Sequence, residues 1–249
     1  MVDTHCHLDY CDPPDAELVR RARGLGVTHL ATVGMNGPSI ERALGAAREH
    51  EGVAAIVGRH PHHSEGFGEA DLEQIEGAAA DPHARAIGET GLDYYRDRAP
   101  RDDQRRAFEA QMELAGRVGL PVVIHTRAAE EDTFAILAEH AADTTVVLHC
   151  FSAPDRLEEC VERGYVCSFA GNVTFKGADA LQRAATEVPE HLLLLETDSP
   201  YLAPVPVRGK PNEPANVTHT AELVSELRGM SYEALDAVVE RNAARVFGW

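Results

Sequence analysis

Short apolar segments recur along this chain, and their spacing constrains the fold more than any other feature. We predict strands near residues 2–7, 27–34, 53–60, 85–90, 121–126, 144–150, 164–169 and 191–197. Their starts lie roughly 20 to 36 residues apart, the length of one strand followed by one helix. Several are continuous apolar runs, such as "TTVVL" and "LLLL", as expected for parallel strands covered by helices. The pattern predicts an α/β fold, a (β/α)8 or TIM barrel.

The segments between these strands carry helical periodicity. In "DDQRRAFEAQMELAGRVG", Phe108, Met112 and Leu114 recur at helical spacing, and Gly119 is the predicted end of the helix. Two more amphipathic helices are predicted in "TAELVSELRG" and "SYEALDAVVERNAARVF", the second with Ser231 as its N-cap. With 249 residues and no linker or low-complexity stretch, the chain is expected to form one domain over its whole length.

Composition and charge exclude some classes of protein. Charged residues make up 26% and hydrophobic residues 44%, which is typical of a globular enzyme. No apolar stretch approaches the about 18 residues that cross a bilayer, and the first residues are too polar for a signal peptide, so we expect a cytoplasmic protein without a membrane partner. The formal charge of −18 argues against non-specific nucleic-acid binding through a basic patch, although metals and a few arginines could still hold an anionic strand.

Residues that commonly bind metals stand at the ends of separate predicted strands. They are His5, His7, Glu89, His125, His149 and Asp198. In a barrel of this kind, catalytic residues come from the carboxyl ends of several strands, so these side chains are expected to converge. Imidazoles and carboxylates are suitable ligands for divalent metals. Six ligands predict two divalent ions, of zinc, manganese or magnesium, that share one carboxylate, with Glu89 as the natural bridge.

Other polar residues near the same strand ends are candidates for catalysis and substrate binding. The predicted catalytic residues are Asp198, as a general base, together with Glu89 and His60. His60 or His62 is expected to meet a substrate phosphate or to protonate the leaving group, and the alternative for both is a polar loop. Glu196 is either a partner of a metal ligand or a buried structural acid. The predicted substrate contacts are His62, Arg127, Asn172, Lys176 and Arg208, for which solvent-exposed loop residues are the alternative.

The sequence resembles the TatD family of metal-dependent hydrolases, usually described as deoxyribonucleases. The resemblance spans nearly the whole chain and rests on "DTHCHLD", "GRHPHH", "AIGETGLDYY", "LPVVIHTR", "HCFS" and "ETDSPYL" in this order. It implies two ligand sets: His5, His7, Glu89 and Asp198 for one metal, and Glu89, His125 and His149 for the other. Arg59 replaces an apolar residue of the family pattern, and Ala153 stands where a glycine commonly follows "HCFS". Neither departure affects a ligand.

These features predict a metal-dependent phosphodiester hydrolase. We expect a 3'-5' exonuclease or deoxyribonuclease that acts on DNA ends or single strands through a water activated by two metals. An amidohydrolase or esterase with the same metals, such as a D-aminoacyl-tRNA deacylase, is the alternative, because this barrel hosts many reactions. A non-catalytic metal-binding or partner-binding protein is disfavoured by the complete ligand set. The predicted partner is DNA as a substrate, and no obligate protein partner is inferred.

Overall fold

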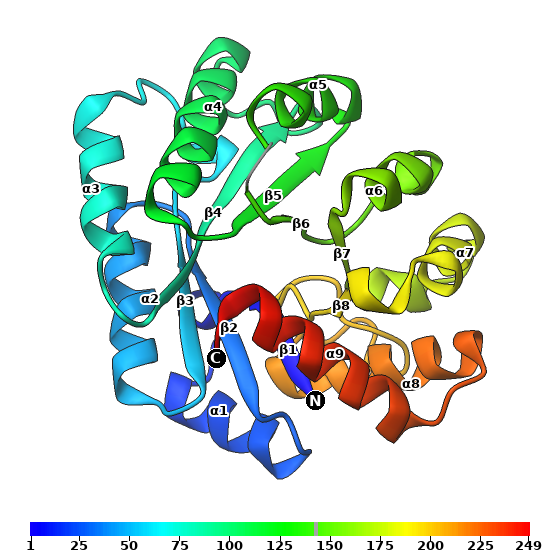
Figure 1. The fold of residues 1–249 in the computed structure, drawn as a ribbon. Helices are drawn as coiled ribbons and strands as arrows, with labels where there is room; N and C mark the ends of the chain where they lie inside the picture. Colours follow the sequence, from blue (N-terminus) through cyan, green and yellow to red (C-terminus); the bar gives the residue numbers. More distant parts are fainter. Residues whose placement is uncertain (142–143) are drawn as a thin grey trace.

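The protein forms a ring of parallel strands with helices around it. The computed structural model describes residues 1–141 and 144–249. Its eight strands form one sheet in the order β1 to β8, and every pair is parallel. The strands are β1 (Val2–Cys6), β2 (His29–Gly34), β3 (Val53–Val57), β4 (Ala84–Asp93), β5 (Val122–Arg127), β6 (Val146–Leu148), β7 (Val166–Phe169) and β8 (Leu193–Leu195). The helices lie outside the strands (Figure 1), which confirms the predicted (β/α)8 barrel.

Backbone hydrogen bonds beyond the end of β8 close the ring. The N–H of Asp198 donates to the carbonyl of His5 at 2.9 Å, and the N–H of His7 donates to the carbonyl of Ser199 at 2.8 Å. Cys6 and Ser199 form a parallel bridge at the same place. The first strand and the segment after the last strand are therefore joined at the residues that were predicted to bind metal.

The helices bury their predicted apolar faces against the strands. They are α1 (Asp15–Gly24), α2 (Gly37–Glu49), α3 (Glu69–Ala79), α4 (Arg101–Val118), α5 (Glu130–His140), α6 (Leu157–Arg163), α7 (Asp179–Glu187), α8 (Val217–Arg228) and α9 (Tyr232–Phe247). In α4, Phe108, Met112 and Leu114 are fully buried, and the helix ends at Gly119 in the left-handed conformation, as predicted. The side chain of Ser231 accepts a hydrogen bond from an N–H in the first turn of α9 and caps it, as predicted.

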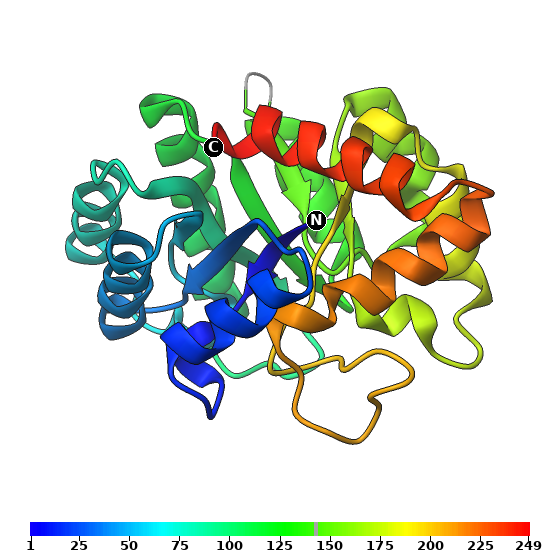
Figure 2. The same cartoon turned by 90° about the horizontal axis from the view of Figure 1, so that it is seen from below.

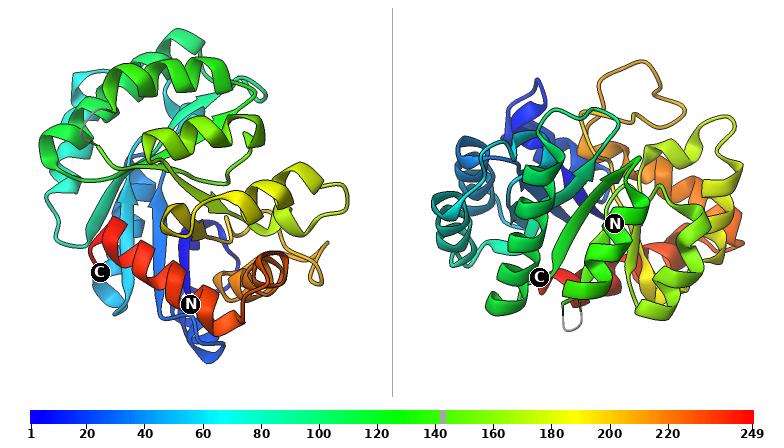
Figure 3. Two further views of the ribbon diagram at one scale, coloured as in Figure 1. Left: turned by 45° about the vertical axis from the view of Figure 1, so that its right-hand side comes forward. Right: turned by 90° about the horizontal axis from the view of Figure 1, so that it is seen from above.

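The two ends of the barrel differ in what covers them. Helix α9 lies at the amino-terminal end of the strands, where the Asn242 amide donates to the carbonyls of Glu190 at 2.6 Å and Leu193 at 2.8 Å. The long segment after β8, residues 200–213, lies at the opposite end (Figures 2 and 3). None of the helices in the described ranges is long and apolar enough to cross a membrane. The carboxyl ends of the strands therefore face a mouth formed by loops, which is where this fold carries its sites.

Some strands differ in length from their predicted ranges. Strand β4 continues to Asp93, whereas β6 and β8 have three residues each. His149 consequently lies just after its strand rather than within it, and Asp198 follows its strand, as predicted, but at a distance of three residues. The loop end of each strand, rather than the strand itself, carries these two side chains into the mouth of the barrel.

Candidate metal centre

Glu89 lies at the centre of the site because β4 is bulged there. The register of β4 against β5 shifts at Glu89, and such a bulge re-aims a side chain. Two residues further on, Gly91 has φ of +136°, and a Cβ at this position would lie 2.0 Å from the carbonyl oxygen of His125. Only glycine permits this approach of the two strands. The bulge turns the Glu89 carboxylate into the mouth of the barrel, where the side chain is only 3% exposed.

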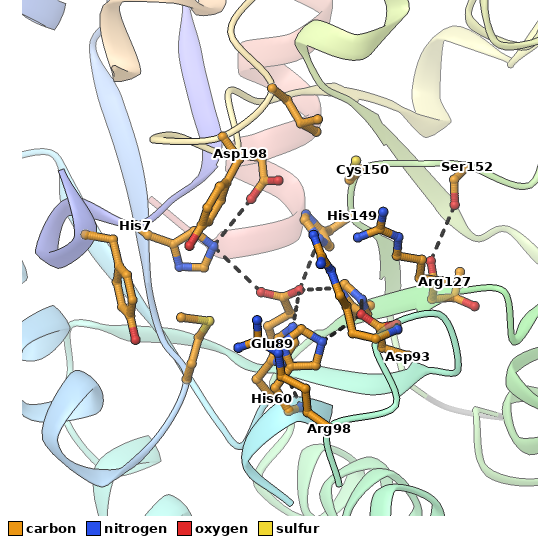
Figure 4. A pocket seen from close by; sticks show the side chains of 18 of the residues that line it. His7, His60, Glu89, Asp93, Arg98, Arg127, His149, Cys150, Ser152 and Asp198 are labelled. Atoms are coloured by element: carbon orange, nitrogen blue, oxygen red, sulfur yellow. Dashed lines mark hydrogen bonds and ion pairs between the residues drawn. The ribbon is translucent and has the colours of Figure 1, made fainter. Parts of the chain in front are cut away.

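The two carboxylate oxygens of Glu89 face different groups of histidines. Its Oε2 lies 3.3 Å from Nε2 of His5 and 3.8 Å from Nε2 of His7. Its Oε1 lies 2.7 Å from Nδ1 of His125 and 3.1 Å from Nε2 of His149. Figure 4 shows Glu89 between His7 on one side and His149 on the other. One side chain thus links two sets of nitrogen donors.

Asp198 lies next to the first of these groups. Its Oδ1 is 3.4 Å from Nε2 of His7 and 4.0 Å from Nε2 of His5. Its side chain is 15% exposed and lines the cavity above the cluster. With Asp198, the structure brings all six predicted ligands together.

A buried ring nitrogen that faces Glu89 indicates a place for a cation. Among the residues that the structure describes, Nε2 of His5 is buried beside Oε2 of Glu89 without a hydrogen bond to it. Leaving such an atom unsatisfied costs about 1–3 kcal/mol. Imidazole nitrogens beside carboxylate oxygens form a donor set that zinc, manganese and related ions accept. The residues present therefore fit divalent cations.

Glu196 contacts the ring of His149 at the nitrogen that does not face Glu89. Its Oε1 lies 2.9 Å from Nδ1 of His149 and also accepts the N–H of Cys150 at 2.9 Å. Burial lowers the pKa of His149, but the charges of Glu89 and Glu196 outweigh burial and hold that pKa well above its usual value. Of the two interpretations of Glu196, the contact favours a partner of a ligand over a purely structural acid.

His60 and His62 lie in a short helical turn after β3. The N–H of His62 donates to Nδ1 of His60 at 2.9 Å, so the proton of a neutral His60 ring is on Nε2. This Nε2 lies 3.4 Å from Oε1 of Glu89. Burial lowers the pKa of His60 to about 3, so the ring is neutral. Nε2 of His62 lies 2.7 Å from Oδ2 of Asp93.

A cavity of about 710 Å³ lies over the six candidate ligands, and only some of the predicted substrate contacts line it. His62, Arg127 and Asn172 line it. Lys176 and Arg208 do not belong to its lining, and the guanidinium of Arg208 lies over the ring of Phe175 instead, 3.7 Å from the centroid. A loop at the correct end of the barrel does not determine where its side chains point, so contacts by Lys176 and Arg208 remain predictions.

Arg96 and Arg98 also line this cavity, although the sequence patterns did not predict them there. They follow β4 directly, in the string "YYRDR". Two arginines placed two residues apart after a strand with a predicted ligand would have been a usable signal, since basic residues number only 23 against 41 acidic ones.

Comparison with known proteins gives matches along almost the whole chain. The family model described as TatD related DNase matches residues 2–248. The uncharacterized metal-dependent hydrolase YabD of Bacillus subtilis is 38% identical over 251 residues, which cover 99% of this chain and 98% of YabD. The protein named 3'-5' ssDNA/RNA exonuclease TatD of Klebsiella pneumoniae is 34% identical over 240 residues, which cover 93% of this chain and 91% of that protein.

Similarity to a solved structure is equally extensive. The crystal structure of YjjV, a TatD homolog from Escherichia coli, matches with a TM-score of 0.93 and 28% sequence identity, and covers 100% of this chain and 98% of YjjV. The compared stretch includes the barrel and all six candidate ligands.

Proposed function

Because this chain belongs to the TatD family of metal-dependent hydrolases, we propose that it is a phosphodiesterase that cleaves nucleic acid at strand ends or in single strands, as a 3'-5' exonuclease or deoxyribonuclease. The observation that carries the proposal is the position of Glu89, each of whose oxygens faces a separate set of nitrogen donors. The name of the Klebsiella relative, which is that of an exonuclease on single-stranded DNA and RNA, supports this substrate class.

The proposal includes two divalent ions with Glu89 as their shared ligand. The first would be held by His5, His7, Asp198 and Oε2 of Glu89, and the second by His125, His149 and Oε1 of Glu89. When bound, such ions polarise a phosphoryl group and lower the pKa of an attacking water to about 7. Zinc, manganese and magnesium are the candidates. Their charge exceeds that of the two carboxylate ligands, which reconciles an anionic substrate with a protein of net charge −18.

Side chains of the cavity supply the remaining steps. The carboxylate of Asp198 is the more exposed of the two acids and accepts the proton of the attacking water. His60 is neutral and carries its proton on Nε2, so it donates a hydrogen bond to a phosphoryl oxygen rather than a proton to the leaving group. Arg127 and Asn172 line the cavity at positions where they contact the phosphate backbone.

A substrate panel with matched metal analysis tests this function. Purified protein would be measured for bound metal and incubated with labelled single-stranded DNA, bis(p-nitrophenyl) phosphate and a D-aminoacyl-tRNA, with zinc, manganese or magnesium and with a chelator. We expect metal-dependent cleavage of the two phosphodiesters. Deacylation of the tRNA without phosphodiester cleavage would instead support the alternative function, an amidohydrolase or esterase. Cleavage that survives complete removal of metal would overturn the proposal.

A further inference from the structure

One side of the cavity is formed by exposed arginines, and an exposed tyrosine outside the lining lies beside two of them. Arg96, Arg98 and Arg127 line the cavity and are exposed. The guanidinium carbons of Arg127 and Arg96 lie 4.1 Å and 5.7 Å from the centroid of the Tyr95 ring. The Tyr95 side chain is 63% exposed. We call these four residues the arginine rim. In Figure 4, Arg127 lies on one side of Glu89 and His7 on the other.

The charges of the arginine rim are not neutralised by the protein. In the part of the chain that the structure describes, none of its three arginines forms an ion pair, whereas neighbouring Arg101 pairs with Asp97. The carboxylate of Asp93 is engaged elsewhere, because its Oδ1 accepts the backbone N–H groups of Tyr95 and Arg96 and its Oδ2 lies 2.7 Å from Nε2 of His62. These bonds fix the start of the segment. On a chain with 41 acidic residues, unpaired guanidinium groups at one cavity indicate an anionic ligand.

The opposite side of the cavity is aromatic and has no excess charge. Tyr10 and Tyr201 flank His7, each with its ring centroid 6.1 Å from that of the imidazole. Their side chains are 41% and 50% exposed. A second cavity, of about 650 Å³, begins beyond Tyr10. The charged residues that line it balance: Asp12 and Glu213 against Arg21 and Lys210.

A single nucleic-acid strand matches this asymmetry in only one direction. Beyond the cleaved bond the strand continues with one negative charge per nucleotide, whereas the released terminal nucleotide carries no phosphate besides the cleaved one. Exposed aromatic rings stack on bases of any sequence, and arginines beside them bind the phosphates. The continuing strand therefore belongs on the arginine rim and the terminal nucleoside at Tyr10 and Tyr201.

We propose that the arginine rim is a subsite for the part of a single-stranded nucleic acid that continues beyond the cleaved bond, with Tyr95 stacked on one of its bases. This inference rests on the proposed function and adds the direction of the strand and a dependence on its length. A dinucleotide has one nucleoside and no further phosphate beyond the cleaved bond, whereas a longer strand brings additional phosphates and bases to the arginine rim.

The test compares kcat/KM for single-stranded DNA of two and of five nucleotides. We expect the longer substrate to be favoured by about tenfold or more in the unmodified protein, since stacking on aromatic rings and binding of phosphates by arginines add binding energy. In the double variant Arg96→Ala/Arg98→Ala the ratio should fall toward one. Arg101→Ala, which removes an arginine of the same segment outside the cavity, should keep the original ratio. Tyr95→Leu should lower the ratio and Tyr95→Phe should retain it.

Salt dependence separates phosphate binding from a merely structural role. The slope of log(kcat/KM) for the longer substrate against log[salt] should become shallower by about 0.7 for each phosphate that the variant no longer neutralises. A structural defect would lower kcat/KM without changing this slope. Binding of labelled five-nucleotide DNA with chelator present gives a readout that does not require turnover, and here the double variant should bind at least several-fold more weakly than Arg101→Ala.

The outcomes distinguish the two proposals. Cleavage of both substrates with an unchanged length ratio and unchanged binding in the double variant would overturn the arginine rim and leave the phosphodiesterase intact. Absence of cleavage with every metal, together with DNA binding that still depends on Arg96 and Arg98, would overturn the proposed function alone. If neither the unmodified protein nor Arg101→Ala binds or distinguishes the longer strand, the subsite is wrong.

Discussion

His149 is held between two carboxylates, with its Nδ1 2.9 Å from Oε1 of Glu196 and its Nε2 3.1 Å from Oε1 of Glu89. A proton held on Nδ1 by Glu196 leaves the lone pair of Nε2 directed at the centre of the cluster. Glu196 thus acts on the site through the ring of His149, although it does not line the cavity.

Removal of Glu196 should weaken one ion and spare the other. Glu196→Ala leaves Nδ1 of His149 without its acceptor, so affinity for the second ion should fall about 10–100-fold. Elemental analysis after dialysis against a weak chelator should show metal content falling from two ions toward one. Glu187→Ala, an exposed change on α7, is the matched control. Two ions bound as tightly as in the unmodified protein would refute this role of Glu196.

Removal of Glu89 should affect both ions. Glu89→Ala deletes the carboxylate that the two ligand groups share, so metal content should drop for the two sites together and phosphodiester cleavage should fall by at least about 10²–10³-fold. Circular dichroism would verify that the barrel remains folded. A well-folded variant with its original activity would exclude a bridging role.

His60 should contribute to the rate without shaping the pH profile. Its imidazole has a pKa of about 3 because it is buried, so it does not titrate between pH 6 and 9. We expect His60→Ala to lower kcat about 10²-fold while the shape of the kcat profile is unchanged over this range. His191→Ala, at an exposed position, serves as the control. Loss of one limb of the profile in His60→Ala would instead identify His60 as a proton donor.

Metal binding should release protons. Burial lowers the pKa of His149 and of His125, but the neighbouring carboxylates outweigh burial and raise both values. A cation requires the neutral ring, so binding displaces these protons and affinity increases as the pH rises toward and past the raised pKa values. Calorimetric titrations of the chelator-treated protein, in buffers with different ionisation enthalpies, should give different heats. Identical heats in all buffers would show that no proton leaves.

Asp3 should make the free energy of unfolding depend on pH. Burial raises its pKa from 3.8 to about 8, although it accepts the N–H of Thr197 at 2.8 Å and the hydroxyl at 2.6 Å. Because the pKa is higher in the folded state, stability is fully present below pH 3.8 and is lost as the pH rises to about 8. Asp3→Asn should be the more stable protein at pH 9, and the difference should shrink toward pH 5. Equal pH dependence in chemical denaturation of both metal-free proteins would contradict this.

The sequence predicted which side chains gather at the mouth of the barrel, because parallel strands in a barrel end at one rim. His5 and His7 are two residues apart at the end of β1, and this spacing, which places both side chains on one face, is readable without a structure. The bulge at Glu89 was not readable, since it depends on how closely β4 approaches β5. Arg96 and Arg98 were missed although their spacing after β4 was a usable signal, and only the folded chain shows that both side chains line the cavity.

The hydrogen bonds that seal β8 to β1 run through the backbone of His5, His7 and Asp198. Loss of these hydrogen bonds would move His5 and His7 away from Asp198, even if the other strands stayed paired. The first group of candidate ligands therefore depends on one junction of the barrel and not only on the apolar core that holds the other strands.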